Sequence, residues 1–219
     1  MYDAIVVGGG ATGTAVLRDL ALRGLKTGLI ERGDLASGCT GNSHGNLVGG
    51  LRYVVNDPVV AAECARENRI FREIAPHLIS GLDNYWVGFN NDYTRAALEA
   101  AKRLGVVAKI LDVDEVYREI PNLTKGFEVA VKSADINIDT TGMCKACLED
   151  GLVHGAMYFP RSSVLSVRSL DEGFELDLGL GRRVKTRRVV NATGAWANSI
   201  LNLFGKNLDL TYNQGTILV

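Results

Sequence analysis

Three glycines near the N-terminus have the spacing of a turn that binds phosphate groups. Gly8, Gly10 and Gly13 form a Gly-x-Gly-x-x-Gly pattern directly after a short apolar run, residues 2–7. In such a turn the first glycine permits the tight bend, the second lets the backbone approach a pyrophosphate, and the third lets a helix pack close to a strand. The N–H groups and positive dipole end of the helix then favour an anion. The pattern predicts a dinucleotide site.

An acidic residue stands where a dinucleotide site needs one. Glu31 follows Gly13 by 18 residues, at the end of a second apolar run, residues 26–30. A carboxylate at this position hydrogen-bonds the ribose hydroxyls of an adenosine and repels a 2′-phosphate. The alternative interpretation is a glycine-rich turn of another α/β fold, with Glu31 as an ordinary surface charge. The turn and the acid by themselves do not distinguish FAD from NAD.

The elements that must position these residues form a predicted β-α-β unit. Residues 2–7 and 26–30 are predicted strands, and residues 15–23 are a predicted helix that ends before Gly24. About thirty residues is the length expected of such a unit. The order predicts an α/β protein with a Rossmann-like fold and a parallel sheet.

Further helices and strands follow in the rest of the sequence. Predicted helices are residues 58–74, 92–104, 112–120, 139–153 and 195–204. Predicted strands are residues 85–89, 127–131, 156–159, 163–167, 173–178, 183–187, 189–192 and 216–219. Residues 33–50 are rich in Gly, Ser, Asn and Thr, and they predict a loop of a length that is uncommon unless the loop has a function.

The composition bounds the class of protein. The chain has 219 residues, 47% of them hydrophobic, and a formal net charge of −1. We expect a globular protein without the basic surface that nucleic acid needs. No run approaches the roughly 18 apolar residues of a membrane span, and the N-terminus lacks the basic region of a signal peptide. We therefore expect a cytoplasmic protein, with any membrane association peripheral or through a partner.

The four cysteines do not form a disulfide-dense framework, which fits a reducing compartment. Cys144 and Cys147 form a single CxxC in the predicted helix 139–153, and no second CxxC completes a metal site. We interpret both as small helix residues and predict no metal; redox or metal chemistry is the alternative.

Two segments resemble known flavoproteins. Residues 38–53, which include a Ser-His-Gly triplet at 43–45 and a Gly-x-Arg-Tyr sequence at 50–53, resemble the flavin-contacting loop of the FAD-dependent glycerol-3-phosphate dehydrogenases, anaerobic type. Residues 189–197, Val-Val-Asn-Ala-Thr-Gly-Ala-Trp-Ala, are similar to the second FAD-contacting element of the wider D-amino-acid-oxidase-like superfamily. The resemblance runs over essentially the whole chain.

The resemblance implies FAD as the cofactor and two interleaved domains. A Rossmann-like FAD-binding domain would comprise residues 1–80 and 140–205, and a partial β-rich substrate domain would comprise residues 81–139 and 206–219. Because members of the family run to several hundred residues, we expect the substrate domain to be truncated at the C-terminus. The implied reaction oxidises sn-glycerol 3-phosphate to dihydroxyacetone phosphate. Electrons would pass from FAD to a quinone through iron–sulfur or membrane-anchor subunits, and the sequence leaves a homo-oligomer open.

Two residues of the loop are candidates for the chemistry, since oxidising an alcohol needs a hydride acceptor, a base and, here, a cation for the phosphate. Arg52 is predicted to bind the phosphate because a guanidinium grips phosphate with two hydrogen bonds, and Tyr53 lies beside it. His44 is the candidate for proton transfer or a flavin contact because imidazole titrates near neutrality. The alternatives are a salt-bridged surface arginine and a loop histidine that only hydrogen-bonds.

The remaining candidates are contacts to the cofactor. The predicted FAD-binding residues are Gly8, Gly10, Ala11, Thr12, Gly13, Glu31, Arg32, Ser37, Thr40, Ser43, His44, Val164, Ala192, Thr193, Gly194 and Trp196. Ser37, Thr40 and Ser43 would donate to the diphosphate or the ring, with loop solvation as the alternative. Val164 would meet the adenine through its backbone, and Trp196 is expected to pack against the protein rather than stack on the cofactor.

One departure from the family bears on the substrate. Enzymes of this type usually carry a histidine where this chain has Val48. Two alternatives therefore stay open: another flavoenzyme of the superfamily, acting on an amino acid or a 2-hydroxy acid, and a cofactor-binding module without activity of its own. An NAD-dependent dehydrogenase does not explain residues 38–53 or the β-rich insertion before Val189.

Overall fold

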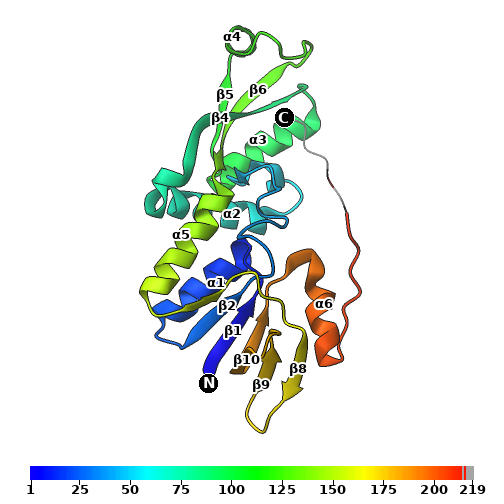
Figure 1. The fold of residues 1–219 in the computed structure, drawn as a ribbon. Helices are drawn as coiled ribbons and strands as arrows, with labels where there is room; N and C mark the ends of the chain where they lie inside the picture. Colours follow the sequence, from blue (N-terminus) through cyan, green and yellow to red (C-terminus); the bar gives the residue numbers. More distant parts are fainter. Residues whose placement is uncertain (214, 216–219) are drawn as a thin grey trace. The chain divides into compact units, whose positions relative to one another are not determined.

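The chain folds into two compact units, each with its own hydrophobic core. The computed structural model describes residues 1–213 and 215, without the side chains of residues 81–83. The first unit comprises Met1–His44 and the described residues from Thr140 onward, and the second comprises Gly45–Asp139 (Figure 1).

The first unit is built on a mixed sheet. Its described strands follow the order β7-β2-β1-β10-β9-β8. They are β1 (Tyr2–Val7), β2 (Thr27–Ile30), β7 (Met157–Phe159), β8 (Ser166–Ser169), β9 (Phe174–Asp177) and β10 (Arg183–Asn191). The strands β7, β2, β1 and β10 are parallel, while β9 and β8 continue the sheet as an antiparallel hairpin. The predicted α/β class with a parallel sheet is confirmed.

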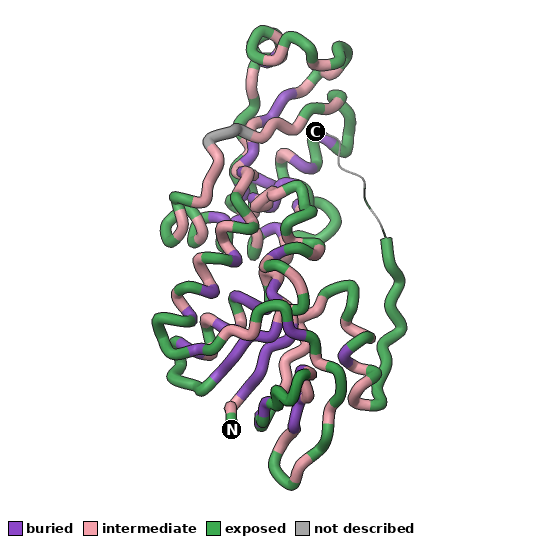
Figure 2. Tube along the Cα trace, in the orientation of Figure 1, coloured by how far each residue is buried: buried purple, intermediate pink, exposed green. Residues whose placement is uncertain are grey.

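Helices cover both faces of this sheet. On one face α1 (Ala11–Leu22) and α5 (Thr140–Val153) lie side by side, and Leu17 of α1 packs with Val6 and Leu29 (Figure 1). On the other face α6 (Ala197–Leu201), between the short 3-10 turns η3 (Gly194–Trp196) and η4 (Asn202–Phe204), packs Ile200 against Ile5. Successive strand residues point to opposite faces, so β1 is buried along most of its length (Figure 2).

The second unit packs helices on an antiparallel sheet. Its strands are β3 (Asn46–Leu47), β4 (Ile79–Gly88), β5 (Ala108–Leu111) and β6 (Val129–Ile138), and β6 pairs with the other three. Its helices are η1 (Leu51–Tyr53), α2 (Pro58–Ile74), η2 (Pro76–Leu78), α3 (Asp92–Leu104) and α4 (Val113–Glu119). Buried Ala61 of α2, Ala101 of α3 and Val131 of β6 meet in its core.

Side-chain caps explain why two predicted helices keep their bounds. The Asp57 carboxylate accepts a hydrogen bond from the Val60 amide at 3.1 Å before α2, and the Asn91 side chain accepts one from the Thr94 amide at 2.9 Å before α3. Each cap satisfies an amide that the first helical turn leaves without a partner. Helices 58–74 and 92–104 are confirmed.

Several predicted bounds were wrong. Helix α1 starts at Ala11 rather than at residue 15, because it begins directly at the glycine turn. Residues 183–187 and 189–192, predicted as two strands, form the single strand β10, since β9 pairs with its first half and β1 with its second. The predicted helix 195–204 is divided into η3, α6 and η4. Strand β5 was not predicted, and the predicted strand 216–219 lies outside the described residues.

The compact units also differ from the predicted domain bounds. The boundary near residues 139 and 140 coincides, but residues 45–80 belong to the second unit because Leu51 and Ala65 pack in the same core as α3. Residues 206–213 group with the first unit, where the Asn198 side chain exchanges two hydrogen bonds of 2.9 Å with the backbone of Leu208. In the described part of the chain, no helix has the length and apolar character to cross a bilayer.

Candidate functional site

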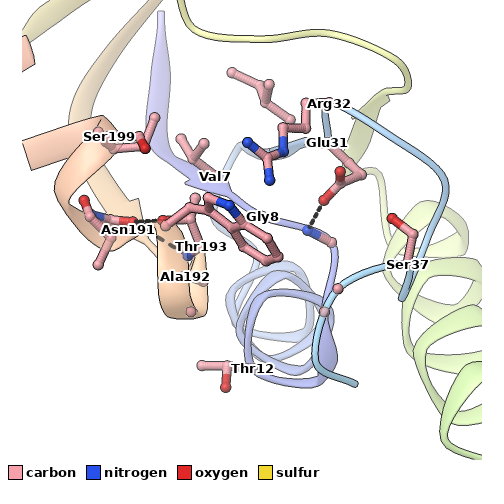
Figure 3. Close-up of a pocket in the computed structure, with 18 of the residues that line it drawn as sticks. Val7, Gly8, Thr12, Glu31, Arg32, Ser37, Asn191, Ala192, Thr193 and Ser199 are labelled. Carbon is pink, nitrogen blue, oxygen red and sulfur yellow. Dashed lines mark hydrogen bonds between the residues drawn. The ribbon is translucent and has the colours of Figure 1, made fainter. Parts of the chain in front are cut away.

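A cavity of about 720 Å³ lies in the first unit (Figure 3). Val7, Ile30 and Asn191, the last residues of the parallel strands β1, β2 and β10, all line it. The carboxyl ends of parallel strands are where open α/β sheets bind their ligands.

The glycine turn closes one wall of the cavity. Gly8 has φ of 110°, and a Cβ built on it would lie 2.5 Å from the carbonyl oxygen of Ala192. A Cβ on Gly13 would overlap the carbonyl oxygen of Gly8, so α1 packs closer to β1 than any side chain permits. The structural roles predicted for these two glycines are therefore confirmed. Gly9, which was not among the predicted residues, also lines the cavity.

The N-terminus of α1 faces this cavity. Gly10 precedes the helix in an extended conformation and provides no side-chain cap. The hydroxyl oxygen of Thr40 instead accepts a hydrogen bond from the Ala11 amide at 3.0 Å. Thr40 was expected to donate to the cofactor; in the structure its oxygen caps the helix, and its hydroxyl hydrogen can still be donated.

The carboxylate of Glu31 ties the turn to the following loop. Its Oε2 accepts a hydrogen bond from the Gly9 amide at 2.6 Å (Figure 3). Its Oε1 accepts one from the Gly33 amide at 2.7 Å. A carboxylate oxygen can accept a second hydrogen bond. The half-buried Glu31 therefore fixes the local backbone and can still accept hydrogen bonds from ribose hydroxyls.

A cation–aromatic pair forms another part of the wall. The guanidinium carbon of Arg32 lies 4.5 Å from the centre of a Trp196 ring, within the range of a cation–π attraction. Both side chains line the cavity, and Trp196 lies so close to Gly38 that a Cβ there would come within 3.2 Å of the indole. Trp196 is 42% exposed, so it lies on the cavity wall rather than in the core.

A residue that was not predicted, Asn191, shapes the loop after β10. Its Oδ1 accepts hydrogen bonds from the Thr193 hydroxyl at 2.7 Å and the Thr193 amide at 3.3 Å, and its Nδ2 donates to the Ala197 carbonyl at 2.9 Å. The sequence could have identified Asn191, since it is an asparagine between an apolar strand and Ala-Thr-Gly. Short polar side chains at such positions form hydrogen bonds with the nearby backbone.

Most of the predicted cofactor residues meet in this cavity. Those that line it are Gly8, Gly10, Ala11, Thr12, Glu31, Arg32, Ser37, Thr40, Val164, Ala192, Thr193, Gly194 and Trp196. Gly13 lies behind the turn, and Ser43 and His44 are exposed and are not among the residues that line the cavity. Arg52 and Tyr53 belong to the second unit, where Arg52 is exposed on η1 and Tyr53 packs partly against the core.

The CxxC residues lie within α5. Cys144 is fully buried, and burial raises the pKa of the Cys147 thiol. A raised pKa keeps the thiol protonated and unreactive. Among residues 1–213 and 215, no group of three His, Cys, Asp or Glu side chains could hold a metal ion.

Comparisons with known sequences agree on one family. The sequence model of the FAD dependent oxidoreductase family, DAO, matches residues 3–219. One component of the anaerobic glycerol-3-phosphate dehydrogenase of Haloferax volcanii is 35% identical over 237 residues, covering 99% of this chain and 40% of that protein. The corresponding component from Haemophilus influenzae is 33% identical, with the same coverage. The chain thus spans about 40% of the length of these curated relatives.

Solved structures share the fold. Glycine oxidase of Geobacillus kaustophilus superimposes with a TM-score of 0.78 at 21% identity, covering 94% of this chain and 59% of that chain. The L-α-glycerophosphate oxidase of Mycoplasma pneumoniae, solved with FAD bound, gives a TM-score of 0.74 at 18% identity, covering 92% and 56%. At such identities the likeness establishes the fold.

Proposed function

Because this chain belongs to the FAD dependent oxidoreductase family, we propose that its cavity binds FAD and that the protein oxidises sn-glycerol 3-phosphate to dihydroxyacetone phosphate. The observation that carries the choice of substrate is the 35% identity with a component of an anaerobic glycerol-3-phosphate dehydrogenase over 99% of the chain. A glycine oxidase of Bacillus licheniformis is more distant, at 27% identity.

The residues of the cavity fit FAD. The turn at Gly8 and Gly10 and the positive dipole end of α1 suit a diphosphate, and Glu31 suits the ribose hydroxyls of the adenosine half. The glycine turn leaves no room for a side chain at Gly8, so main chain rather than a side chain forms this part of the cavity wall. When bound, FAD supplies the acceptor for the hydride of the alcohol carbon.

The second unit supplies the cation for the substrate. Arg52 is exposed on a short 3-10 turn whose neighbours Leu51 and Val54 are buried. We assign the phosphate to this guanidinium, since its planar donors match phosphate oxygens in pairs. Tyr53, next to it, contributes a hydroxyl to the same substrate surface. His44 is the base that we assign to the hydroxyl proton, since histidine is the side chain that most often serves as a general base.

Electrons leave the protein through a partner. The relatives in Haloferax and Haemophilus are each named as one component of a larger enzyme, which implies further subunits in those enzymes. We propose that this protein likewise passes its electrons to iron–sulfur or membrane-anchor subunits, which deliver them to a quinone, and that it meets the membrane only peripherally through these partners.

The test begins with the FAD-loaded protein under anaerobic conditions. We expect sn-glycerol 3-phosphate to bleach the visible absorbance of the oxidised flavin. Arg52→Ala should retain FAD and raise the substrate concentration for half-bleaching at least about tenfold, as expected for a lost charge-assisted contact of roughly 1.5 kcal/mol. Arg69→Ala, which removes an exposed arginine of α2, is the charge-matched control and should have no effect.

Each other result supports a named alternative. Bleaching by an amino acid or a 2-hydroxy acid, but not by glycerol 3-phosphate, would identify another flavoenzyme of the family. FAD binding without bleaching by any of these compounds would support a cofactor-binding module. Failure to bind FAD would reject the proposal altogether.

A further inference from the structure

The backbone just before Arg52 is enclosed on two sides within the second unit. A Cβ on Gly49 would lie 2.7 Å from the Cβ of Ala134 in β6. A Cβ on Gly50, which has φ of 101°, would overlap the carbonyl oxygen of Ala61 in α2. Residue 50 is buried and residue 51 after it is buried as well, so this stretch runs between a strand and a helix with no room for a side chain at either glycine.

A buried asparagine joins the same three segments. Asn68 of α2 is 1% exposed. Its Nδ2 donates hydrogen bonds to the Leu47 carbonyl at 3.1 Å and to the Ala134 carbonyl at 3.0 Å. Its Oδ1 accepts one from the Nε of Arg72 at 2.8 Å, and Arg72 donates a second, also of 2.8 Å, to Ala134. All the polar atoms of this amide side chain are therefore used.

The carboxylate of Asp135 binds residues 47–50 at a second point, the Gly49 amide. The Oδ1 of Asp135, the residue after Ala134, accepts a short hydrogen bond from the Gly49 amide. The backbone of Asp135 is itself fixed, because its amide donates to the Ser133 hydroxyl at 3.2 Å and its carbonyl accepts from the Asn84 side chain at 3.1 Å.

The turn that follows is anchored by apolar side chains. Leu51 and Val54 are 6% and 2% exposed, and both pack in the core with Ala61. The Tyr53 amide donates to the Gly50 carbonyl at 3.0 Å. Arg52 is thus an exposed residue on a turn held by buried ones, and the direction in which it leaves the surface depends on the backbone of residues 47–50.

We propose that Asn68 and Asp135 are positioning residues for substrate binding: together they fix the backbone of residues 47–50 and so set the place of the Arg52 guanidinium. This inference rests on the proposed role of Arg52. A buried amide with every polar atom bonded specifies one arrangement, whereas apolar packing alone tolerates several. A guanidinium that must meet phosphate in a paired geometry gains from such a fixed backbone.

The test compares three substitutions at Asn68 and Asp135 in the FAD-loaded protein, with an artificial electron acceptor that reoxidises the flavin after each turnover. Asp135→Ala removes the acceptor for the Gly49 amide, and Asn68→Ala removes the bonds to Leu47 and Ala134. We expect each to raise KM for glycerol 3-phosphate about tenfold, with kcat and FAD content within about twofold of the unsubstituted protein. Asp135→Asn keeps an acceptor oxygen and should restore KM to within about threefold.

Two further variants separate positioning from general stability. Val116→Ala removes two buried methyl groups of α4 in the same unit and should lower the melting temperature without changing KM. Arg72→Lys keeps the charge at the exposed edge but loses the two-pronged contact, so KM should rise about threefold even if the buried variants do not fold. Hydrogen exchange at the Gly49 amide should accelerate in Asp135→Ala and not in Val116→Ala.

The outcomes are distinguishable. If the unsubstituted protein does not oxidise glycerol 3-phosphate, the proposed function fails and this role of Asn68 and Asp135 fails with it. If it does, but KM in Asp135→Ala, Asn68→Ala and Arg72→Lys stays within about twofold of the Val116→Ala value, the positioning role is rejected and the function stands.

Discussion

The two units use glycine for opposite purposes. In the first unit, Gly8 and Gly13 bring a helix against a strand, and the cavity opens beside this turn. In the second unit, Gly49 and Gly50 let the chain pass between a strand and a helix, where a side chain at either position would clash. The first arrangement exposes backbone to a ligand, and the second fixes backbone so that one side chain, Arg52, is exposed.

Under the proposed function, the same residue type serves recognition in two ways. Backbone amides suit a diphosphate, whose charge is spread over several oxygens and needs several donors. A smaller substrate phosphate is better held by one guanidinium of fixed geometry. We therefore expect substitutions in the first unit to change FAD affinity, and substitutions around residues 47–52 to change substrate affinity.

The largest expected effect is at Gly13. In Gly13→Ala the new methyl group overlaps the Gly8 carbonyl oxygen, so α1 must move away from β1. We expect a loss of stability on the order of 4 kcal/mol, together with loss of FAD binding. Urea unfolding and the flavin content of the purified protein measure both.

A matched helical glycine provides the control for this prediction. A Cβ on Gly151 of α5 would make ordinary contacts of 3.5 Å and more with α1. Gly151→Ala should therefore leave FAD binding unchanged and stabilise the helix by up to about 1 kcal/mol. Equal damage from both substitutions would contradict the role of the glycine turn.

A smaller effect is expected at Glu31. Gln in its place cannot accept hydrogen bonds at both side-chain ends from the amides of Gly9 and Gly33. We expect Glu31→Gln to weaken FAD binding by about 2 kcal/mol, or about thirtyfold in Kd, measured by fluorescence titration of the apoprotein. Asp34→Asn, which removes an exposed ion pair with Arg161, should stay within about twofold. A similar Kd for both variants would show that the region is sensitive to any lost charge.

The smallest expected effect is on stability, from the charge of Glu175, which is not among the residues that line the cavity. A hydrogen bond from Arg168 holds the pKa of Glu175 below its ordinary value, helped by the charges of Arg183 and Lys185 and opposed by burial. Since the native pKa is the lower one, the stabilisation is complete above the unfolded pKa of about 4.3 and is lost as pH falls through the native pKa.

Glu175→Gln should therefore lower the urea midpoint at about pH 7, and the difference from the unsubstituted protein should shrink as the pH falls below about 4. FAD affinity at neutral pH should not change, because Glu175 is not among the residues that line the cavity. A difference that persists undiminished at low pH would mean that the contribution is not electrostatic.

Local signals in the sequence were enough for several parts of the molecule. Asp57 and Asn91 cap the helices that follow them, so both helices have the predicted bounds. The glycine turn and Glu31 were found from spacing alone, and Gly8, Gly10 and Glu31 line the cavity. These features depend on neighbours within one short stretch of chain, which is the range over which sequence patterns specify structure.

Other parts depend on contacts between distant residues. Strand β5 forms by pairing with β6, about twenty residues later in the chain. Strand β10 is continuous because its first half pairs with β9 and its second half pairs with β1. Asn68 carries no sign of its role in the helical pattern of residues 58–74, since its partners Leu47 and Ala134 lie 21 and 66 residues away. The role of such residues can be identified only from the folded structure.

The sequence by itself determined the α/β class, the glycine turn, the acid that follows it and the resemblance to flavin-dependent oxidoreductases. Each of these features depends on residues that lie close together in the chain, within one supersecondary unit. Only the tertiary structure decided that residues 45–80 fold with the second unit rather than the first, and which buried side chains hold the backbone before Arg52. The physical reason is that burial and hydrogen-bond partners are properties of the folded neighbourhood, and no local pattern encodes a neighbour that arrives from elsewhere in the chain.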